Sequence, residues 1–151
     1  MMIGWLAAYV AAHPDVLMSG PGTVILDGDN EPEPDAVLMF RPGAGGQAYL
    51  SEKDYIVGAP ELVIEISASS VSVDLGDKMR AYRRNGVREY IVWSTYDEQI
   101  RWFVLRSGDF ELLEPDGTGV VHSSVFEGLR LHVPALLRGD LAVVLKTQSG
   151  I

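Results

Sequence analysis

The chain has 151 residues, of which 47% are hydrophobic and 22% charged, and it contains no cysteine. This is the composition of one soluble globular domain, long enough to bury a core without disulfides. The missing cysteines exclude thiolate metal sites and cysteine nucleophiles, and they fit the cytoplasm, where we expect the protein to lie. The formal net charge of −9 repels a polyanion at long range, so nucleic-acid binding would need a local basic patch or bound cations.

The first predicted element is a helix within MMIGWLAAYVAAH, residues 1–13. Its predicted buried stripe consists of residues at helical spacing: Ile3, Leu6, Ala7 and Val10. The segment has no basic n-region and is too short to span a bilayer, which favours a core helix over a signal peptide or a membrane anchor. No acidic residue lies on it, and we expect no membrane association.

Short strands follow. The segments VLM at 16–18 and TVILDG at 23–28 are predicted strands, separated by a turn cluster of Ser, Gly and Pro. After an acidic, proline-rich stretch, Asp35 precedes the apolar run 36–40, which is typical of a strand covered on both faces. Residues 41–54 predict a Gly-rich surface loop, whose GAGG lacks the ending and the following helix of a phosphate-binding loop.

The segment PELVIEIS, residues 60–67, predicts a buried strand, and 68–72 a polar loop. A helix is then expected from Asp74 to Asn85. Asp74 is a suitable N-cap residue, and Gly86 can end the helix. Its buried face is predicted from apolar residues at positions i, i+4 and i+7: Leu75, Met79 and Tyr82.

The rest of the chain continues with strands. The segment REYIVWS is one, and QIRWFVLRSGDFELLEPDG predicts a hairpin that turns at 107–109. LRLHV at 129–133 is the last strand, after which Pro134 can open a short helix. This order predicts one α/β (α+β) domain over 1–151, a mixed sheet flanked by helices, with a right-handed crossover joining parallel strands from 61 to 93. The apolar segments YIVW and WFVL suggest a homodimer.

Glu65 is unexpected in an apolar strand. Side chains alternate along a strand, so Glu65 shares one face with Glu61, Val63 and Ser67. A buried carboxylate without a partner takes up a proton or costs several kcal/mol. Its compensation is open at this point: a salt bridge, a sheet face exposed to water, or a metal ion would each provide it.

The metal interpretation uses Asp35, which opens the other strongly apolar strand. If the two strands are neighbours, the carboxylates of Asp35 and Glu65 converge, and like charges repel unless a cation lies between them. Mg²⁺ takes one or two protein carboxylates together with waters and substrate phosphate oxygens. The pair therefore suggests phosphoryl chemistry, although an Asp after Pro at a strand start is also a common turn residue.

Lys78 lies at the edge of the buried stripe when the helix is projected at 100° per residue. Its ammonium either reaches water along the core or points over the strand end toward Glu65, and the sequence favours neither. In the second orientation it could orient or deprotonate a water, or neutralise charge on a phosphate. Four arginines are candidate nucleic-acid contacts, the first three on the solvent flank of the helix: Arg80, Arg83, Arg84 and Arg88.

The histidines and serines do not form a recognisable site. His13, His122 and His132 have no metal-ligand spacing, and the last two are interpreted as structural. The serines near residue 67 lack the GxSxG elbow of a Ser/His/Asp hydrolase.

Three segments together resemble the PD-(D/E)XK nuclease superfamily: PD at 34–35, PELVIEIS at 60–67 and DLGDKMRAYRRNGVREYIVW at 74–93. Within it they are similar to the bacterial restriction-endonuclease-like group called Uma-two, over about residues 5 to 139. The resemblance implies a restriction-endonuclease-like core that cleaves DNA with Mg²⁺ or Mn²⁺. It makes Asp35 and Glu65 the metal ligands, together with the backbone carbonyl of Ile66.

The resemblance also locates the catalytic lysine. Ser67 stands where the superfamily usually has this lysine, and Lys78 resembles the lysine that related families carry on the following helix. Ser67, Asp74 and Tyr82 would support the site. Relatives usually begin with a further segment, which we expect this chain to lack.

Two main functions compete. The first is a Mg²⁺-dependent endonuclease that hydrolyses DNA phosphodiester bonds. The second is a catalytically inactive family member that acts as a dimeric or partner-binding module, with Glu65 paired to Lys78 or an arginine. An unrelated small-molecule enzyme is a weaker third reading.

Overall fold

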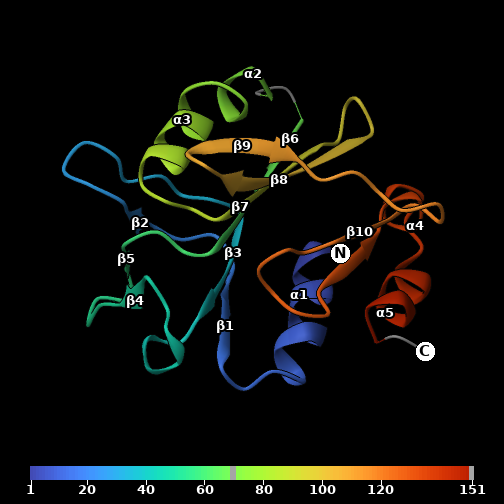
Figure 1. Ribbon diagram of the computed structural model, residues 1–151, viewed down its shortest axis with the longest axis horizontal. Coiled ribbons are helices and arrows are strands. Elements are labelled where there is room, and N and C mark those ends of the chain that lie inside the picture. Colours follow the sequence, from blue (N-terminus) through green and yellow to red (C-terminus); the bar gives the residue numbers. More distant parts are fainter. Residues whose placement is uncertain (69–70, 150–151) are drawn as a thin grey trace.

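A six-stranded mixed sheet forms the centre of the computed structural model, which describes residues 1–68 and 71–149 (Figure 1). The strand order is β1-β3-β6-β7-β8-β9. Within it β6 and β7 run parallel and all other neighbours are antiparallel, as the predicted crossover between the 60–67 and REYIVWS strands requires. The strands are β1 Val16–Ser19, β3 Ala36–Phe40, β6 Leu62–Ser67, β7 Glu89–Ser94, β8 Gln99–Arg106 and β9 Asp109–Leu112.

Two small sheets accompany the large one. Strands β2 Val24–Ile25, β5 Ile56–Val57 and β4 Tyr49–Leu50 form a three-stranded sheet, and β10 Val120–His122 pairs with β11 Arg130–His132. A 3-10 helix, η1 Pro42–Ala44, lies in the Gly-rich segment. The sequence predicts β2 and β11 too long and misses β4, β5 and β10, because two or three residues carry too little periodicity.

Helices cover both faces of the large sheet (Figure 1). Helices α1 Met2–Ala11, α4 Val133–Leu137 and α5 Leu141–Ser149 pack on one face, and α2 Val71–Asp74 and α3 Asp77–Arg84 lie over the other. Leu62 and Ile64 of β6 point into the first core, and Val63 into the second. Strand β6 is therefore covered on both faces, which explains its nearly continuous apolar sequence.

The buried stripe predicted for α1 is wrong apart from Leu6. Ile3 is 44% exposed, Ala7 is exposed and Val10 is half-buried, whereas the buried residues are Met2, Trp5, Leu6 and Tyr9. The helix is apolar on nearly all sides, so more than one stripe fits helical spacing. The stripe with Trp5 and Tyr9 buries more area, and both polar atoms find backbone carbonyl acceptors.

The helix predicted from Asp74 to Asn85 consists of two helices. Asp74 is the last residue of α2 and not an N-cap, and α3 starts at Asp77 after Gly76. Gly76 has φ −109° and ψ −105°, which is outside the helical region and separates the two helices. The predicted polar loop at 68–72 is partly wrong, because α2 already begins at residue 71, and residues 69–70 lie outside the described part of the chain.

The hairpin predicted at 107–109 is confirmed as the connection between β8 and β9. Ser107 and Gly108 both have positive φ, 53° and 82°, which two-residue hairpin turns of the I′ type require. The short helix predicted near Pro134 is also confirmed as α4. At its start, the side chain of His132 accepts a hydrogen bond from the backbone amide of Ala135. Helix α5 is not predicted.

The observation behind the predicted homodimer is wrong. Tyr90, Ile91 and Val92 of the YIVW segment are completely buried, and Trp102 and Val104 of WFVL are buried too. These side chains form the cores of one chain and no exposed apolar patch. In the described residues, no helix has the length and hydropathy needed to cross a membrane.

Candidate active site

Asp35 and Glu65 lie at the same point of two neighbouring strands. In the antiparallel pair of β3 and β6, Ala36 faces Ile64, and Asp35 lies one residue before β3, next to the end of β6 that carries Glu65. The Asp35 amide donates to the Ile64 carbonyl over 3.1 Å, and Asp35 Oδ2 accepts from the Ile66 amide at 2.7 Å. The predicted neighbourhood of the two acids is therefore present.

Glu65 is 2% exposed, and two side chains from α3 compensate its charge. Its Oε2 accepts a hydrogen bond of 2.9 Å from the Tyr82 hydroxyl and lies 3.3 Å from the ammonium of Lys78. Burial raises the pKa of Glu65 above its ordinary value, although Lys78 and Tyr82 both act against this shift. Of the compensations left open by the sequence, the ion pair is present.

Lys78 points toward the strand and not only into solvent. Its Nζ also lies 3.2 Å from Oδ1 of Asp74, four residues earlier, and its side chain is 36% exposed. Burial by itself lowers the pKa of Lys78, but the carboxylates of Glu65 and Asp74 together outweigh burial and raise it above 10.5. The ammonium is therefore charged at neutral pH, which favours electrostatic stabilisation over deprotonation of a water.

Two tyrosines fix the α2–α3 segment over the end of β6. Tyr82 is completely buried, and burial followed by the charge of Glu65 raises the pKa of its hydroxyl, which stays a donor. The Tyr90 hydroxyl donates to the Asp74 carbonyl at 2.8 Å, and the two tyrosine ring centroids are 5.0 Å apart. Asp74 is thus held by its backbone while its carboxylate holds Lys78.

Ser67 and Ile66 complete this end of β6. Ser67 is buried, and its carbonyl accepts from the amide of Thr95 at 2.9 Å and from its hydroxyl at 3.3 Å. The side chain of Ile66 is on the opposite face from Glu65 and is 37% exposed. Ser67 is thus a small buried residue, and the ammonium that contacts Glu65 belongs to Lys78 of α3.

The donor set fits a hydrated magnesium ion better than a metal bound by protein alone. Among the residues that the structure describes, no three His, Cys, Asp or Glu side chains are grouped so that they could hold a metal. Two carboxylates and a backbone carbonyl are hard oxygen donors, and Mg²⁺ keeps several waters and binds substrate phosphates. Asp35, Glu65 and the Ile66 carbonyl meet that requirement in chemical type.

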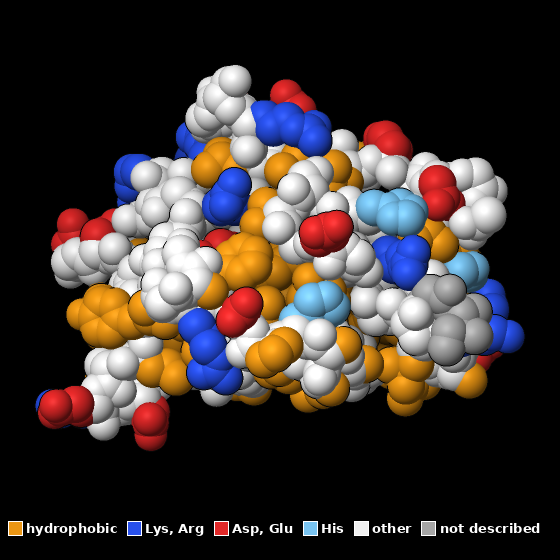
Figure 2. Space-filling view, turned by 60° about the horizontal axis from the view of Figure 1, so that its bottom comes forward, with side chains coloured by type: hydrophobic (Ala, Val, Ile, Leu, Met, Phe, Trp, Pro, Cys, Tyr) orange, Lys and Arg blue, Asp and Glu red, His pale blue; other side chains and the backbone are white. Residues whose placement is uncertain are grey.

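Three of the four candidate arginines pair with acids of their own chain. Arg80 contacts Asp77, Arg83 lies 3.5 Å from an oxygen of Asp109, and Arg84 lies 4.0 Å from one of Asp27. Arg88 is exposed. On the face shown in Figure 2, Lys and Arg side chains are spread among Asp and Glu and do not gather into one basic patch.

Glu61, the residue before β6, is a second buried acid, and the sequence predicts no role for it. It is 1% exposed, and its carboxylate accepts from the amides of Phe40 at 3.2 Å and Gln47 at 2.9 Å. It holds the Gly-rich segment against the sheet. The alternation of side chains along the strand places Glu61 and Glu65 on one face and so could have predicted that Glu61 is buried. It does not show that the two acids have different partners.

The histidines make contacts within the fold. His13 stacks on Tyr9 with ring centroids 3.8 Å apart, and Nε2 of His122 lies 3.0 Å from Asp116 Oδ2. His132 caps α4, as described above. These contacts agree with the structural interpretation of His122 and His132.

Comparison with known proteins identifies the family. No curated protein matches the chain. The crystal structure of "a putative nuclease belonging to DUF820" from Anabaena variabilis superposes with a TM-score of 0.65 at 17% identity, covering 95% of this chain and 77% of that one, which shows a shared fold. The family model described as "Putative restriction endonuclease", Uma2, matches residues 2–134. The chain therefore belongs to the Uma2 family of restriction-endonuclease-like proteins, as its motifs predict.

Proposed function

We propose that this protein is a nuclease that hydrolyses DNA phosphodiester bonds with Mg²⁺, or Mn²⁺ in its place. The observation that supports it most is that Asp35 contacts Ile66, the residue after Glu65, while the ammonium of Lys78 contacts the Glu65 carboxylate. The ligands would be one oxygen of each acid and the carbonyl of Ile66. In the structure Oδ2 of Asp35 and Oε2 of Glu65 contact protein donors, so we assign metal binding to Oδ1 and Oε1.

Each residue then has a distinct task. A bound Mg²⁺ would polarise the phosphate and lower the pKa of a water. Lys78 stabilises negative charge that develops on the phosphate, because its raised pKa keeps it protonated. Tyr82 orients Glu65, and Asp74 orients Lys78.

The arginines on and after α3 are proposed as phosphate contacts. Exposed ion pairs such as Arg83 with Asp109 contribute only about 0–1 kcal/mol, so a DNA phosphate can replace the acid at small cost. Arg80, Arg84 and the exposed Arg88 would act in the same way. Since the whole chain carries a formal charge of −9, the divalent cation would provide much of the attraction.

The substitution Asp35→Asn tests the proposal. The wild type should nick supercoiled plasmid DNA only when Mg²⁺ or Mn²⁺ is added, and Asp35→Asn should not. Calorimetric titration with Mn²⁺ should show one saturable site that the variant lacks. Asp15→Asn is the matched control, because the exposed Asp15 precedes β1 as Asp35 precedes β3. Equal cleavage by Asp35→Asn would refute the assignment.

The second candidate is an inactive family member that serves as a dimeric or partner-binding module. The observation that favours it is the pair of contacts on Glu65, because Lys78 and Tyr82 already compensate the charge of that carboxylate through Oε2. This candidate predicts a folded protein with no saturable Mn²⁺ site. The same titration therefore separates the two functions before any DNA substrate is chosen.

A further inference from the structure

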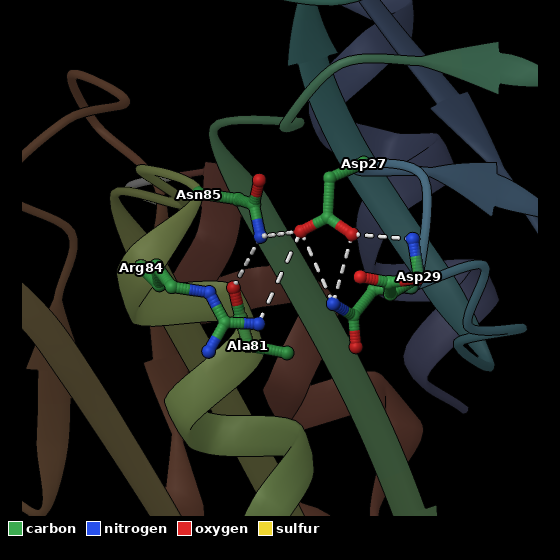
Figure 3. A network of polar contacts seen from close by, with 6 residues as sticks. Asp27, Asp29, Ala81, Arg84 and Asn85 are labelled. Carbon is green, nitrogen blue, oxygen red and sulfur yellow. Dashed lines mark hydrogen bonds and ion pairs between the residues drawn. The ribbon is translucent and has the colours of Figure 1, made fainter.

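A network of polar contacts centred on Asp27 joins the β2–β3 loop to the end of α3 (Figure 3). Asp27 Oδ2 accepts from Asn85 Nδ2 at 3.0 Å, and the same nitrogen donates to the Ala81 carbonyl at 2.9 Å. Arg84 lies 4.0 Å from this carboxylate. Within the loop, Oδ1 accepts from the amide of Asp29 at 2.8 Å and from the Asn30 side chain at 2.9 Å. We call these contacts the Asp27 clamp.

Helix α3 needs contacts outside itself to hold its position. It has 8 residues, and its N-cap Gly76 provides no side-chain hydrogen bond. Isolated helices of this length are marginal in water. Yet α3 carries Lys78 and Tyr82, the two side chains that contact Glu65. The Ala81 carbonyl, which the clamp reaches through Asn85, belongs to the residue before Tyr82.

The charge of Asp27 is placed against the helix dipole. A carboxylate at the C-terminal end of a helix meets the partial negative charge of free carbonyls, which is unfavourable. The hydrogen bonds from the Asp29 amide, Asn85 and Asn30 compensate this and lower the pKa of Asp27 to about 2. The carboxylate is therefore ionised at neutral pH, and the clamp does not switch with pH near neutrality.

The loop side of the clamp borders the candidate site. Residues 29–32 form one wall of a cavity of about 290 Å³, and Asp77, Lys78 and Tyr82 lie along the other wall. The clamp thus fixes both walls relative to each other. One wall belongs to the loop that leads to Asp35, and the other carries the charged group assigned to the phosphate.

We propose that Asp27 is a positioning residue of this site. Through Asn85 it fixes the end of α3, and this sets Lys78 and Tyr82 on Glu65. The activity part of this inference rests on the proposed nuclease function. The structural part, the dependence of the Tyr82–Glu65 contact on Asp27, does not.

The kinetic test compares Asp27→Ala with Asp116→Ala. Asp116 is a matched control, because its carboxylate also accepts from nearby turn donors, Thr118 and the Val120 amide, and lies in the turn before β10. Asp27→Ala should lower kcat for Mg²⁺-dependent cleavage by about tenfold or more and change KM by less than about twofold, since misplaced catalytic groups act on kcat. Asp116→Ala should leave kcat unchanged.

A double-mutant cycle isolates the link to α3. If Asp27 acts through Asn85, Asn85→Ala should give the same loss of kcat, and the double variant should lose no more than either single variant. Additive losses would overturn the proposed link. Asn85→Ala also replaces Asp27→Ala as the test variant if the latter does not fold.

A contact measurement separates failure of this inference from failure of the proposed function. With 3-fluorotyrosine at position 82, the fluorine resonance should shift in Asp27→Ala in the direction seen in Glu65→Ala, which removes the acceptor, and it should stay in place in Asp116→Ala. If the wild type cleaves no DNA, the nuclease proposal fails, and this resonance still tests whether the Tyr82–Glu65 contact depends on Asp27. An unchanged resonance in Asp27→Ala would overturn the inference.

Discussion

Two buried carboxylates on the same sheet face should respond in opposite ways to the same substitution. Glu61 and Glu65 are 1% and 2% exposed and share the face covered by α3. Backbone amides of Phe40 and Gln47 bind the first, whereas side chains of α3 bind the second. We predict that Glu61→Gln destabilises an active enzyme and that Glu65→Gln inactivates a stable one.

Glu65→Gln keeps an acceptor for the Tyr82 hydroxyl and removes the buried charge. Burial raises the pKa of Glu65, so removing the charge relieves a desolvation cost. The lost ion pair with Lys78 offsets this only in part, because Lys78 is 36% exposed and retains Asp74. The free energy of unfolding should therefore change by less than about 1 kcal/mol, while Mg²⁺-dependent cleavage falls at least about 100-fold.

Glu61→Gln affects a carboxylate that accepts two backbone hydrogen bonds. The amide oxygen can keep one of them, but the NH₂ group then meets the other N–H donor. Losing one bond to a charged group costs about 1.5–3 kcal/mol. For a domain of this size that lowers Tm by roughly 5–10 °C. Cleavage per folded molecule should stay within about twofold of wild type, because Glu61 has no task in the proposed chemistry.

Urea unfolding and plasmid nicking, both at 25 °C, check the two variants. The nicking assay must be run where each variant remains folded, which the unfolding curves define. A stable, fully active Glu65→Gln protein would refute the metal-ligand assignment. A folded but inactive Glu61→Gln protein would show that both acids belong to the site and that their partners do not distinguish them.

Two further predictions concern stability. Gly46→Ala should lower the free energy of unfolding by about 3 kcal/mol or prevent folding, because a Cβ there would lie 2.1 Å from the Phe40 carbonyl oxygen. Gly43→Ala should change the free energy of unfolding by less than about 0.5 kcal/mol, because a Cβ at Gly43 would have no atom within 4 Å. Urea unfolding of both variants measures the contrast, and equal effects would contradict the close approach. Burial raises the pKa of Glu89 above 4.5, so the folded state binds this proton more tightly than the unfolded state, and stability falls as pH rises from 4.5 through the raised pKa. Glu89→Gln should remove that part of the decline, and identical pH dependence of Tm in wild type and variant would rule the explanation out.

The central strands and the anomaly of Glu65 are predictable from the sequence. Runs such as Ala36 to Phe40 are too apolar for a one-sided strand, and a strand–helix–strand unit with a short helix favours parallel neighbours. The sequence does not predict that β3 and β6 are neighbours, and the metal interpretation only assumes it. The 21 residues between them form a loop, η1 and two strands of two residues each, none of which has a usable period.

Contacts between loops and helix ends could not be predicted. The hydrogen bond from Asn85 to Asp27 joins residues 58 positions apart, and neither residue belongs to a periodic pattern. The ion pair of Asp74 with Lys78 had a signal in its i, i+4 spacing, but the expected N-cap role of Asp74 hid it. The break between α2 and α3 lies at Gly76, and the sequence there is equally compatible with one continuous helix and with two helices.

The formal charge around Glu65 favours a divalent cation over an inactive scaffold. Glu65 and Asp74 are buried and Asp35 is half-buried, and all three lie at the end of β6 or over it. In the part of the chain that the structure describes, one ammonium, that of Lys78, pairs with Glu65 and Asp74. Three carboxylates and one ammonium leave a formal charge of −2, and such an excess is unfavourable where water is largely excluded. A scaffold without metal would be more stable with a second cation or one fewer acid, whereas a bound Mg²⁺ makes the set neutral. The proposed nuclease therefore adds a cation to this excess of negative charge, whereas the inactive module would rely on Lys78 and on the hydrogen bonds from Tyr82 and the Ile66 amide.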